Sequence, residues 1–177
     1  MIESAERDRL LQLARDAIAA YLAGLPAPVP AASPSLDRRA GVFVSLHKGR
    51  ALRGCIGHIE PDQPLARAIP SAAVAAASTD PRFEPMTVEE LADVAIELSI
   101  LGPLERIKGV DEIEVGRHGL LVERGWNRGL LLPQVALEWG WDAEAFLSQT
   151  CHKAGLPPDA WKDATIWRFE AEVFSEP

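Results

Sequence analysis

The chain has 177 residues, of which 47% are hydrophobic and 25% are charged, as in a soluble globular protein with one core or two small lobes. Its formal net charge of −8 disfavours duplex nucleic acid as a main partner, because such binding relies on lysine and arginine side chains that neutralise phosphates. No apolar run reaches the roughly 18 residues of a membrane span, and the charged start lacks the pattern of a secretory signal, so we expect a cytoplasmic protein with no membrane partner.

The two cysteines, Cys55 and Cys151, are far apart in the sequence and show none of the paired spacing of a metal site. We therefore predict no metal centre and two free thiols in a reducing compartment, with a single disulfide between them as the alternative. Cys151 shares an apolar helical arc with Phe146 and Leu147, so we expect it in the core.

The first 40 residues are predicted to form a helix followed by an extended strap. Residues 3–23 place apolar side chains at helical spacing, and Gly24 follows them directly. Prolines recur through residues 25–35, which we expect to lie extended on the surface of the same domain, since a lone helix before them could not fold by itself.

A β-hairpin followed by a helix is predicted next. Residues 41–59 are rich in β-branched and apolar side chains, and Lys48-Gly49 supplies a tight turn. Asp62 is expected to cap the following alanine-rich helix, and Pro70 within it predicts a kink or a break.

The clearest later strand lies within residues 92–107. Alternation divides it into an apolar face and a mixed face that carries Glu97. The apolar face consists of Val94, Ile96, Leu98 and Ile100. A carboxylate in the middle of such a strand needs a partner, and Arg53 or Arg82 would serve, unless that face is simply solvated.

The second half repeats the order of hairpin and helix. Its predicted elements are a short strand at 112–115, a hairpin within 118–133 that turns at Gly125-Trp126-Asn127, a helix from Pro133, a helix capped by Asp142 that ends at Gly155, and one final strand at 165–176. Strands grouped as hairpins with interleaved helices favour an α+β fold over a parallel doubly wound sheet. Neither of the two glycine-rich phosphate-binding motifs is present.

The stretch ALRGCIGHIEP at residues 51–61 is unusual for a strand because glycine weakens a strand interior, so its glycines indicate a close backbone approach, a bulge or a site. Simple alternation places Arg53, Cys55 and Gly57 on one face and the residues between them on the other. A cation beside Cys55 would favour its thiolate, the form that a nucleophile or metal ligand requires, and Gly57 would leave space for a ligand. In the alternative interpretation Cys55 is a small buried apolar residue and Arg53 a structural ion-pair partner.

Further candidate residues lie outside this strand. Asp80 and Arg82 would line a site, or else Asp80 bonds nearby backbone amides while Phe83 fills the core. A dyad of Cys55 with His118, which precedes the second hairpin, would supply a base for the thiol.

The hexapeptide LRGCIG resembles the signature of the AMMECR domain family. Further stretches match that family in the family's order, and they cover most of the chain from about residue 40. They are ALRGCIGHIEP (51–61), TDPRFEP (79–85), IELSIL (96–101), GRHGLL (116–121), GLLLPQV (129–135) and CHKAGL (151–156). The GHIEP continuation and the short length resemble the prokaryotic branch, called protein A of the AmmeMemoRadiSam system.

The resemblance implies a single domain over residues 1–177, with the helix and strap (1–40) preceding a two-lobed core (41–177). The implied fold is a duplicated β-α-β-β arrangement with a cleft between the lobes. It implies no established reaction or known cofactor. The family's recurring residues correspond here to Arg53, Gly54, Cys55, Gly57, Asp80, Arg82, Phe83, Glu97, Gln134 and Lys153.

Two functional hypotheses follow, and the sequence does not decide whether the protein is an enzyme. In the first, the chain belongs to a modification pathway with a Memo-like protein and a radical S-adenosylmethionine enzyme. Cys55 is then the nucleophile or ligand, Arg53 binds anions and stabilises the thiolate, and Glu97 and His118 complete the catalytic group. In the second, the same surface is a non-catalytic adaptor that binds a peptide or a partner subunit.

Overall fold

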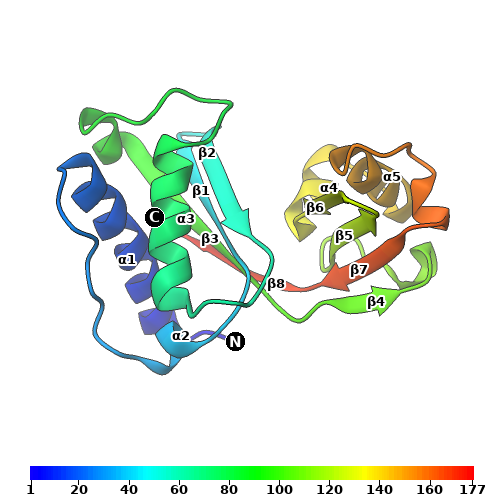
Figure 1. Ribbon diagram of the computed structural model, residues 1–177, viewed down its shortest axis with the longest axis horizontal. Helices are drawn as coiled ribbons and strands as arrows, with labels where there is room; N and C mark the ends of the chain where they lie inside the picture. Colours follow the sequence, from blue (N-terminus) through cyan, green and yellow to red (C-terminus); the bar gives the residue numbers. More distant parts are fainter. The chain divides into compact units, whose positions relative to one another are not determined.

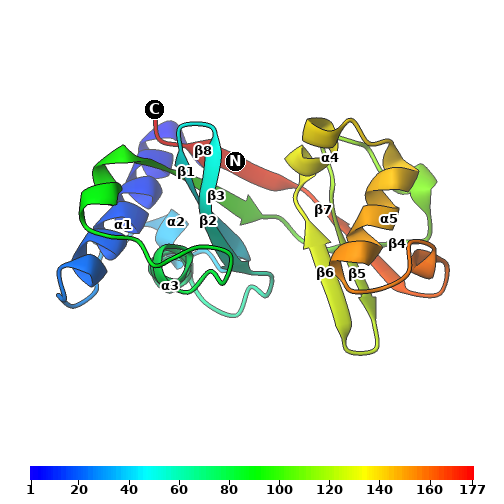
Figure 2. The same ribbon diagram turned by 90° about the horizontal axis from the view of Figure 1, so that it is seen from above.

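The computed structural model describes all 177 residues, which form two compact units (Figures 1 and 2). The first unit comprises Met1–Leu101 and Glu172–Pro177, and the second comprises Gly102–Ala171. Each unit contains one four-stranded sheet and its own helices, so the predicted α+β class with two hairpin–helix units is confirmed. None of the helices is both long and apolar enough to span a bilayer.

The first unit has a sheet with strand order β2-β1-β3-β8, in which β1 pairs antiparallel with both β2 and β3. Its elements are α1 (Ser4–Leu22), α2 (Pro34–Asp37), β1 (Val42–Lys48), β2 (Ala51–His58), α3 (Leu65–Ser78), a 3-10 turn (Glu89–Asp93), β3 (Val94–Leu101) and β8 (Ala171–Ser175). Helices α1 and α3 pack against each other and cover one face of this sheet.

The core of the first unit lies between that face and the two helices. The predicted apolar face of β3 is confirmed, since Val94, Ile96, Leu98 and Ile100 are all buried in it. Helix α3 contributes mainly alanines to this core, and their small side chains let the helix backbone approach the sheet closely.

The second unit has the strand order β4-β7-β5-β6, with antiparallel pairing throughout. Its elements are β4 (Glu105–Ile107), a 3-10 turn (Val110–Glu112), β5 (Gly119–Arg124), β6 (Asn127–Leu131), α4 (Pro133–Trp139), α5 (Ala143–Lys153), a 3-10 turn (Ala160–Lys162) and β7 (Thr165–Phe169). Asp142 caps α5 as predicted, because its carboxylate accepts the Ala145 N–H at 2.8 Å.

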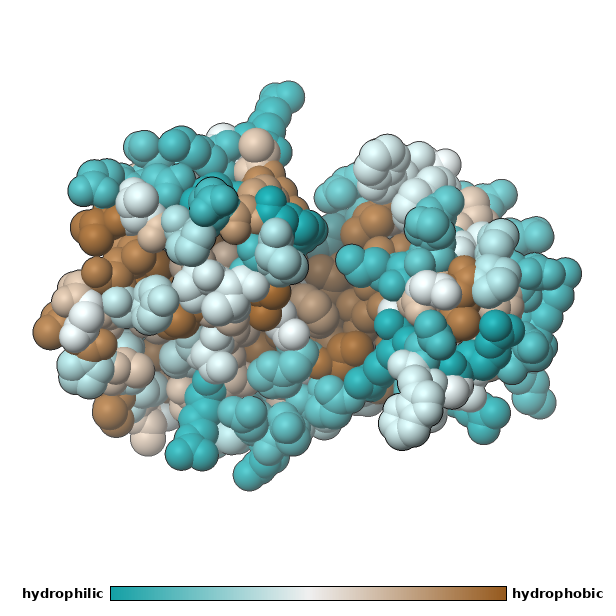
Figure 3. All heavy atoms as spheres, turned by 45° about the horizontal axis from the view of Figure 1, so that its top comes forward, coloured by the Kyte–Doolittle hydropathy of each residue, from teal (hydrophilic) through white to brown (hydrophobic).

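The two hairpins turn in the same way. Each has a two-residue loop, Gly49-Arg50 or Gly125-Trp126, whose glycine has a positive φ (+61° and +60°). A positive φ at the first loop position is the pattern of a type II′ turn, whose twist matches that of the flanking strands. On the face drawn in Figure 3, hydrophilic residues cover most of the surface and apolar residues are exposed in patches between them.

Several predicted elements differ in the structure. Asp62 does not cap α3, which begins after Pro64 without a side-chain cap. The helix continues through Pro70 without a break, because the neighbouring Ala68, Ile69, Ala72 and Ala73 are buried and their packing outweighs the lost backbone bond. Residues 112–115 contain no strand.

The predicted final strand is two strands that belong to different sheets. Phe169 in β7 is buried in the second unit, and Phe174 in β8 packs against the core of the first. Between them the Glu170 carbonyl accepts the Gly102 N–H at 2.8 Å, which joins the two segments where the chain leaves and re-enters the first unit.

Gly54 in β2 provides a test of the close packing of α3 on the sheet. A Cβ atom there would lie 2.2 Å from the Ala76 carbonyl oxygen of α3, which is backbone and cannot rotate away. We expect Gly54→Ala to lower the free energy of unfolding by about 2 kcal/mol or more, measured by urea denaturation. Gly109→Ala is the matched control, because its Cβ would meet only the Asp111 carboxylate at 3.2 Å; equal losses in both variants would contradict the close approach of α3.

Candidate functional site

Strand β2 lies at the edge of the sheet in the first unit and contains a β-bulge. Leu46 pairs with Gly54 but His47 pairs with Leu52, so Arg53 has no partner on β1. The bulge changes the predicted alternation: Leu52, opposite His47, shares the face of Cys55, and Arg53 is the extra residue between Leu52 and Gly54. The bulge considered for this glycine-rich stretch is therefore present, centred on the arginine.

The Arg53 guanidinium binds the loop that follows α3. Nε and Nη2 donate to the two Glu90 carboxylate oxygens at 3.0 and 3.1 Å, and Nη2 also donates to the Glu84 carbonyl at 2.9 Å. The hydrogen bond from Arg53 is the main cause of the lowered pKa of Glu90. Arg53 therefore ties residues 84–90 to the edge strand, and its charge is already paired with a carboxylate.

Asp80 is buried and is bonded to Arg82 and to the backbone of Cys55. Its Oδ2 accepts the Cys55 N–H at 2.9 Å and Arg82 Nη2 at 2.8 Å, and its Oδ1 accepts Arg82 Nε and N–H at 3.0 and 3.1 Å. The bond from Arg82 holds the pKa of Asp80 well below its usual range, although burial acts in the opposite direction. Asp80 is therefore a buried carboxylate that keeps its charge.

Arg82 completes the contact with the Cys55 peptide group. Its Nη2 lies 3.4 Å from the Cys55 carbonyl oxygen, so the Asp80–Arg82 pair meets both the N–H and the C=O of Cys55. The Phe83 ring lies close to both guanidinium groups, 6.0 Å from that of Arg53 and 5.4 Å from that of Arg82. Residues 80–83 thus cover the open edge of β2 in place of a neighbouring strand.

The Cys55 thiol lies on the face of the sheet opposite α1 and α3. Ser45 Oγ donates to Cys55 Sγ at 3.2 Å, and the register places Ser45 between Cys55 on one side and Glu97 on the other. Cys55 is half-buried, whereas Cys151 is fully buried and burial raises the pKa of its thiol.

Two residues on the same face of the sheet as the thiol are absent from the sequence-based candidates. Ser45 is one, and His47, which follows on the same face of β1, is the other. His47 Nε2 is buried and has no hydrogen-bond partner. The expected space at Gly57 is filled, since a Cβ there would lie 2.6 Å from the Phe43 ring.

The predicted site residues divide between the two units. The first unit holds Arg53, Gly54, Cys55, Gly57, Asp80, Arg82, Phe83 and Glu97, and the second holds His118, Gln134 and Lys153. His118 is buried, its Nδ1 accepts the Glu114 N–H at 3.0 Å, and burial lowers its pKa, so it is neutral at pH 7. Gln134 Oε1 is buried without a partner, and Lys153 is exposed in the last turn of α5. No group of three or more His, Cys, Asp or Glu side chains is arranged to hold a metal ion.

Comparisons with known proteins cover almost the whole chain. A family model described as AMMECR1 matches residues 11–174. A protein of Methanothermobacter thermautotrophicus is 49% identical over 180 residues, covering 94% of this chain and 92% of its own. A Thermococcus gammatolerans protein is 49% identical over 181 residues, covering 94% and 88%. The crystal structure of the uncharacterized protein PH0010 from Pyrococcus horikoshii matches with a TM-score of 0.94 at 45% identity, covering 99% of this chain and 93% of that one.

The buried Asp80 predicts an acid-sensitive fold. Its pKa is lowered in the folded protein, so it stabilises the fold fully above its unfolded value of 3.8 and loses that contribution as the pH falls toward the folded pKa. We expect Asp80→Asn to lower the free energy of unfolding at pH 7 by about 2 kcal/mol and to flatten its decline below about pH 4. Urea denaturation from pH 2.5 to 7 measures both effects. The exposed Asp62→Asn is the control, and an Asp80→Asn profile parallel to that of the unaltered protein would refute the assignment.

Proposed function

The chain belongs to the AMMECR1 family, and from that premise we propose that it is a component of a modification pathway in which Cys55 is the reactive group. The family resemblance adds the expected partners, a Memo-like protein and a radical S-adenosylmethionine enzyme, and a cytoplasmic setting. The radical chemistry then belongs to the cofactor of that partner enzyme. This chain supplies a nucleophile held in a fixed position.

The observation that carries the proposal is the set of contacts made to Cys55. Its peptide group is bonded by Asp80 and Arg82, and its thiol accepts a hydrogen bond from Ser45. A cysteine that only fills space needs neither a buried ion pair nor a hydroxyl donor, as Cys151 illustrates. Cys55 is also more accessible than Cys151, as a group that meets a substrate must be.

Each nearby side chain has a role in this proposal. Ser45 donates to the sulfur and holds it in position, and Arg82, whose side chain is 52% exposed, supplies the positive charge that the sequence had assigned to Arg53. His47 Nε2, on the same face, is the group available to accept the thiol proton. The thiolate would attack an electrophilic carbon of an acyl or alkyl donor and displace its leaving group.

The second candidate is a non-catalytic adaptor. It is favoured by the fact that the contacts of Arg53, Asp80 and Arg82 also protect an open sheet edge, which every edge strand requires. In that case Cys55 would be positioned only because its backbone lies at the edge. The two candidates differ in the reactivity that they require of the thiol.

Thiol alkylation tests the nucleophile. We expect iodoacetamide at pH 7 to label Cys55 at least tenfold faster than free cysteine and to leave Cys151 unlabelled in the folded protein, as followed by intact-mass and peptide mass spectrometry. Ser45→Ala should lower the rate several-fold, because the sulfur loses the hydroxyl that holds it in position. Ser45→Thr keeps the hydroxyl and is the matched control. Labelling of Cys55 at an ordinary rate, unaffected by Ser45→Ala, would support the adaptor instead.

Co-purification tests the partners. A tagged form of this chain should retain a Memo-like protein or a radical S-adenosylmethionine enzyme from its own source when they are co-expressed. In the nucleophile proposal, Cys55→Ala keeps this binding and abolishes the modification. Failure to retain either protein would count against both the pathway and the adaptor.

A further inference from the structure

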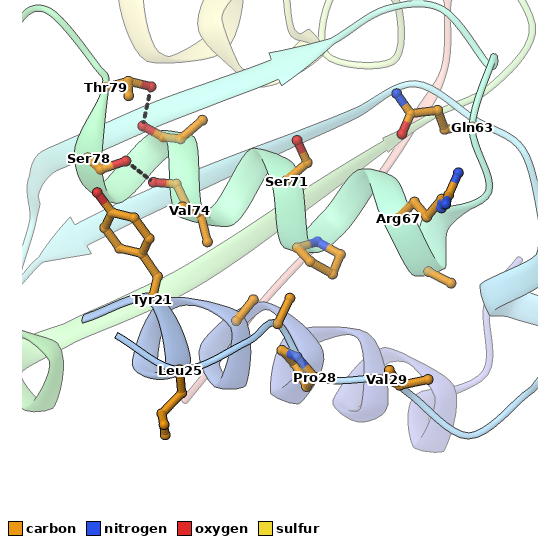
Figure 4. A pocket seen from close by; sticks show the side chains of 15 residues that line it. Tyr21, Leu25, Pro28, Val29, Gln63, Arg67, Ser71, Val74, Ser78 and Thr79 are labelled. Carbon is orange, nitrogen blue, oxygen red and sulfur yellow. Dashed lines mark hydrogen bonds between the residues drawn. The ribbon is translucent and has the colours of Figure 1, made fainter. Parts of the chain in front are cut away.

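A groove of about 790 Å³ lies on the first unit, on the side of α3 that faces away from the sheet (Figure 4). Its walls are α3, the C-terminal half of α1 and residues 25–29 of the proline-rich strap. The lining follows α3 from Ala66 to Thr79, a length of about 20 Å at 1.5 Å per residue. The groove is therefore elongated, and its volume falls in the range of roughly 300–1,000 Å³ that is typical of small-molecule sites.

The walls are mainly apolar along the middle of the groove, where Ser71 is the one polar residue, and polar at its ends. Pro70 and Val74 of α3, Ala17 of α1 and Pro28 of the strap form the apolar stretch. Figure 4 shows Arg67 and Gln63 at one end, and Tyr21 with the hydroxyls of Ser78 and Thr79 at the other.

The charge of the lining is opposite to that of the whole protein. Arg67 is its one charged residue, and no Asp or Glu lines the groove although the chain has 26 acidic residues and a net charge of −8. Arg67 lies in the first turn of the 14-residue α3, whose N-terminal end favours anions. The side chains of the other arginines of α1 and of residues 34–53, apart from Arg50, bond to carboxylates or carbonyls. The exposed guanidinium of Arg67 makes no hydrogen bond or ion pair, and only its backbone N–H is bonded, to the Pro64 carbonyl.

The helix wall of the groove offers a peptide no backbone partner. The N–H groups of α3 beyond its first turn are used within the helix, and Pro26, Pro28 and Pro30 of the strap have no N–H to donate. A peptide lying there could bond only to the strap, where the carbonyls and remaining N–H groups of residues 26–32 make no backbone hydrogen bond. An alkyl chain has no polar groups to satisfy.

The strap is attached only near its ends. Leu25 N–H donates to the Ala20 carbonyl, Ser33 bonds to Glu6 and caps α2, and no backbone hydrogen bond is made by residues 26–32. Its Leu25 and Val29 side chains are 64% and 94% exposed. Such a segment can move over a ligand with no loss of backbone bonds, and closing would bury both side chains.

We propose that this groove binds a long-chain carboxylate, with the carboxylate group at Arg67 and the alkyl chain along Pro70 and Val74 toward Tyr21. The site is distinct from Cys55, because α3 separates the groove from the sheet. A free single-chain acid is the ligand that an apolar trough with one unpaired arginine recognises.

The fluorescent fatty acid cis-parinaric acid is the probe for this site. We expect saturable binding that oleate displaces and that oleyl alcohol, which lacks the charge, displaces at least tenfold less well. Arg67→Gln should weaken binding at least tenfold, and the matched Arg50→Gln, in the hairpin loop, should not. Ser71→Trp fills the groove from its exposed side without touching the core and should abolish binding while the far-UV circular dichroism is unchanged.

Three results would overturn the proposal. One is the absence of saturable binding, and another is binding that Ser71→Trp leaves intact. The third is self-association in sedimentation experiments that Ser71→Trp abolishes, which would make a second copy of the chain the occupant. None of these results bears on Cys55, so the proposed function stands or falls separately.

Discussion

The peptide group of Cys55 lies at an open sheet edge, and the ion pair of Asp80 with Arg82 binds both of its polar atoms. An edge strand exposes a row of unpaired N–H and C=O groups, and here a carboxylate replaces the acceptor and a guanidinium the donor of a missing strand. The arrangement fixes the backbone on which the thiol is carried. It also fixes the loop after α3, because both charged residues belong to that loop.

A buried carboxylate is costly unless its lone pairs are satisfied. Asp80 meets this condition with two backbone N–H groups and two guanidinium nitrogens, and half of the Arg82 side chain remains in water. Only one charge is therefore fully desolvated. Arg53 is held on both oxygens of Glu90 and Arg82 on both oxygens of Asp80, but the side chain of Arg82 is 52% exposed whereas that of Arg53 is 15% exposed. The positive charge beside Cys55 that the sequence assigned to Arg53 is therefore better supplied by Arg82.

Much of the fold could be predicted from the sequence because its signals are local. Alternation on β3, the glycine at each hairpin turn and the Asp142 cap each depend on a few neighbouring residues. The division of the last strand between two sheets could not be predicted, because β7 and β8 differ only in which distant core receives Phe169 and Phe174. The passage of α3 through Pro70 likewise depends on tertiary packing.

The geometry of the candidate site could be predicted even less well, because it also depends on a contact that is distant in sequence. Counted from the turn, Lys48 pairs with Ala51, and an unbroken ladder would continue to Ser45 opposite Gly54. The bulge shifts that register by one residue and brings Ser45 opposite Cys55. The glycines indicate a bulge in this strand, but no local pattern places it at Arg53, because the loop that holds the Arg53 guanidinium lies about 30 residues further along the chain. The motif identified the strand that carries the site, but the partners of the thiol depend on a contact that is distant in sequence.

Helix α3 links the Cys55 site to the groove, because one of its faces packs against the sheet and the other lines the groove. The face with Ala72 and Ala76 lies so close to β2 that only glycine fits at position 54, and that contact sets the height of the helix above the edge strand. The other face forms the wall of the groove as far as Thr79, and the next residue is Asp80. The end of α3 therefore borders the groove and also positions the carboxylate that binds Cys55. Small side chains on one face of this helix account for both the tight sheet contact and the place of the ion pair at the edge.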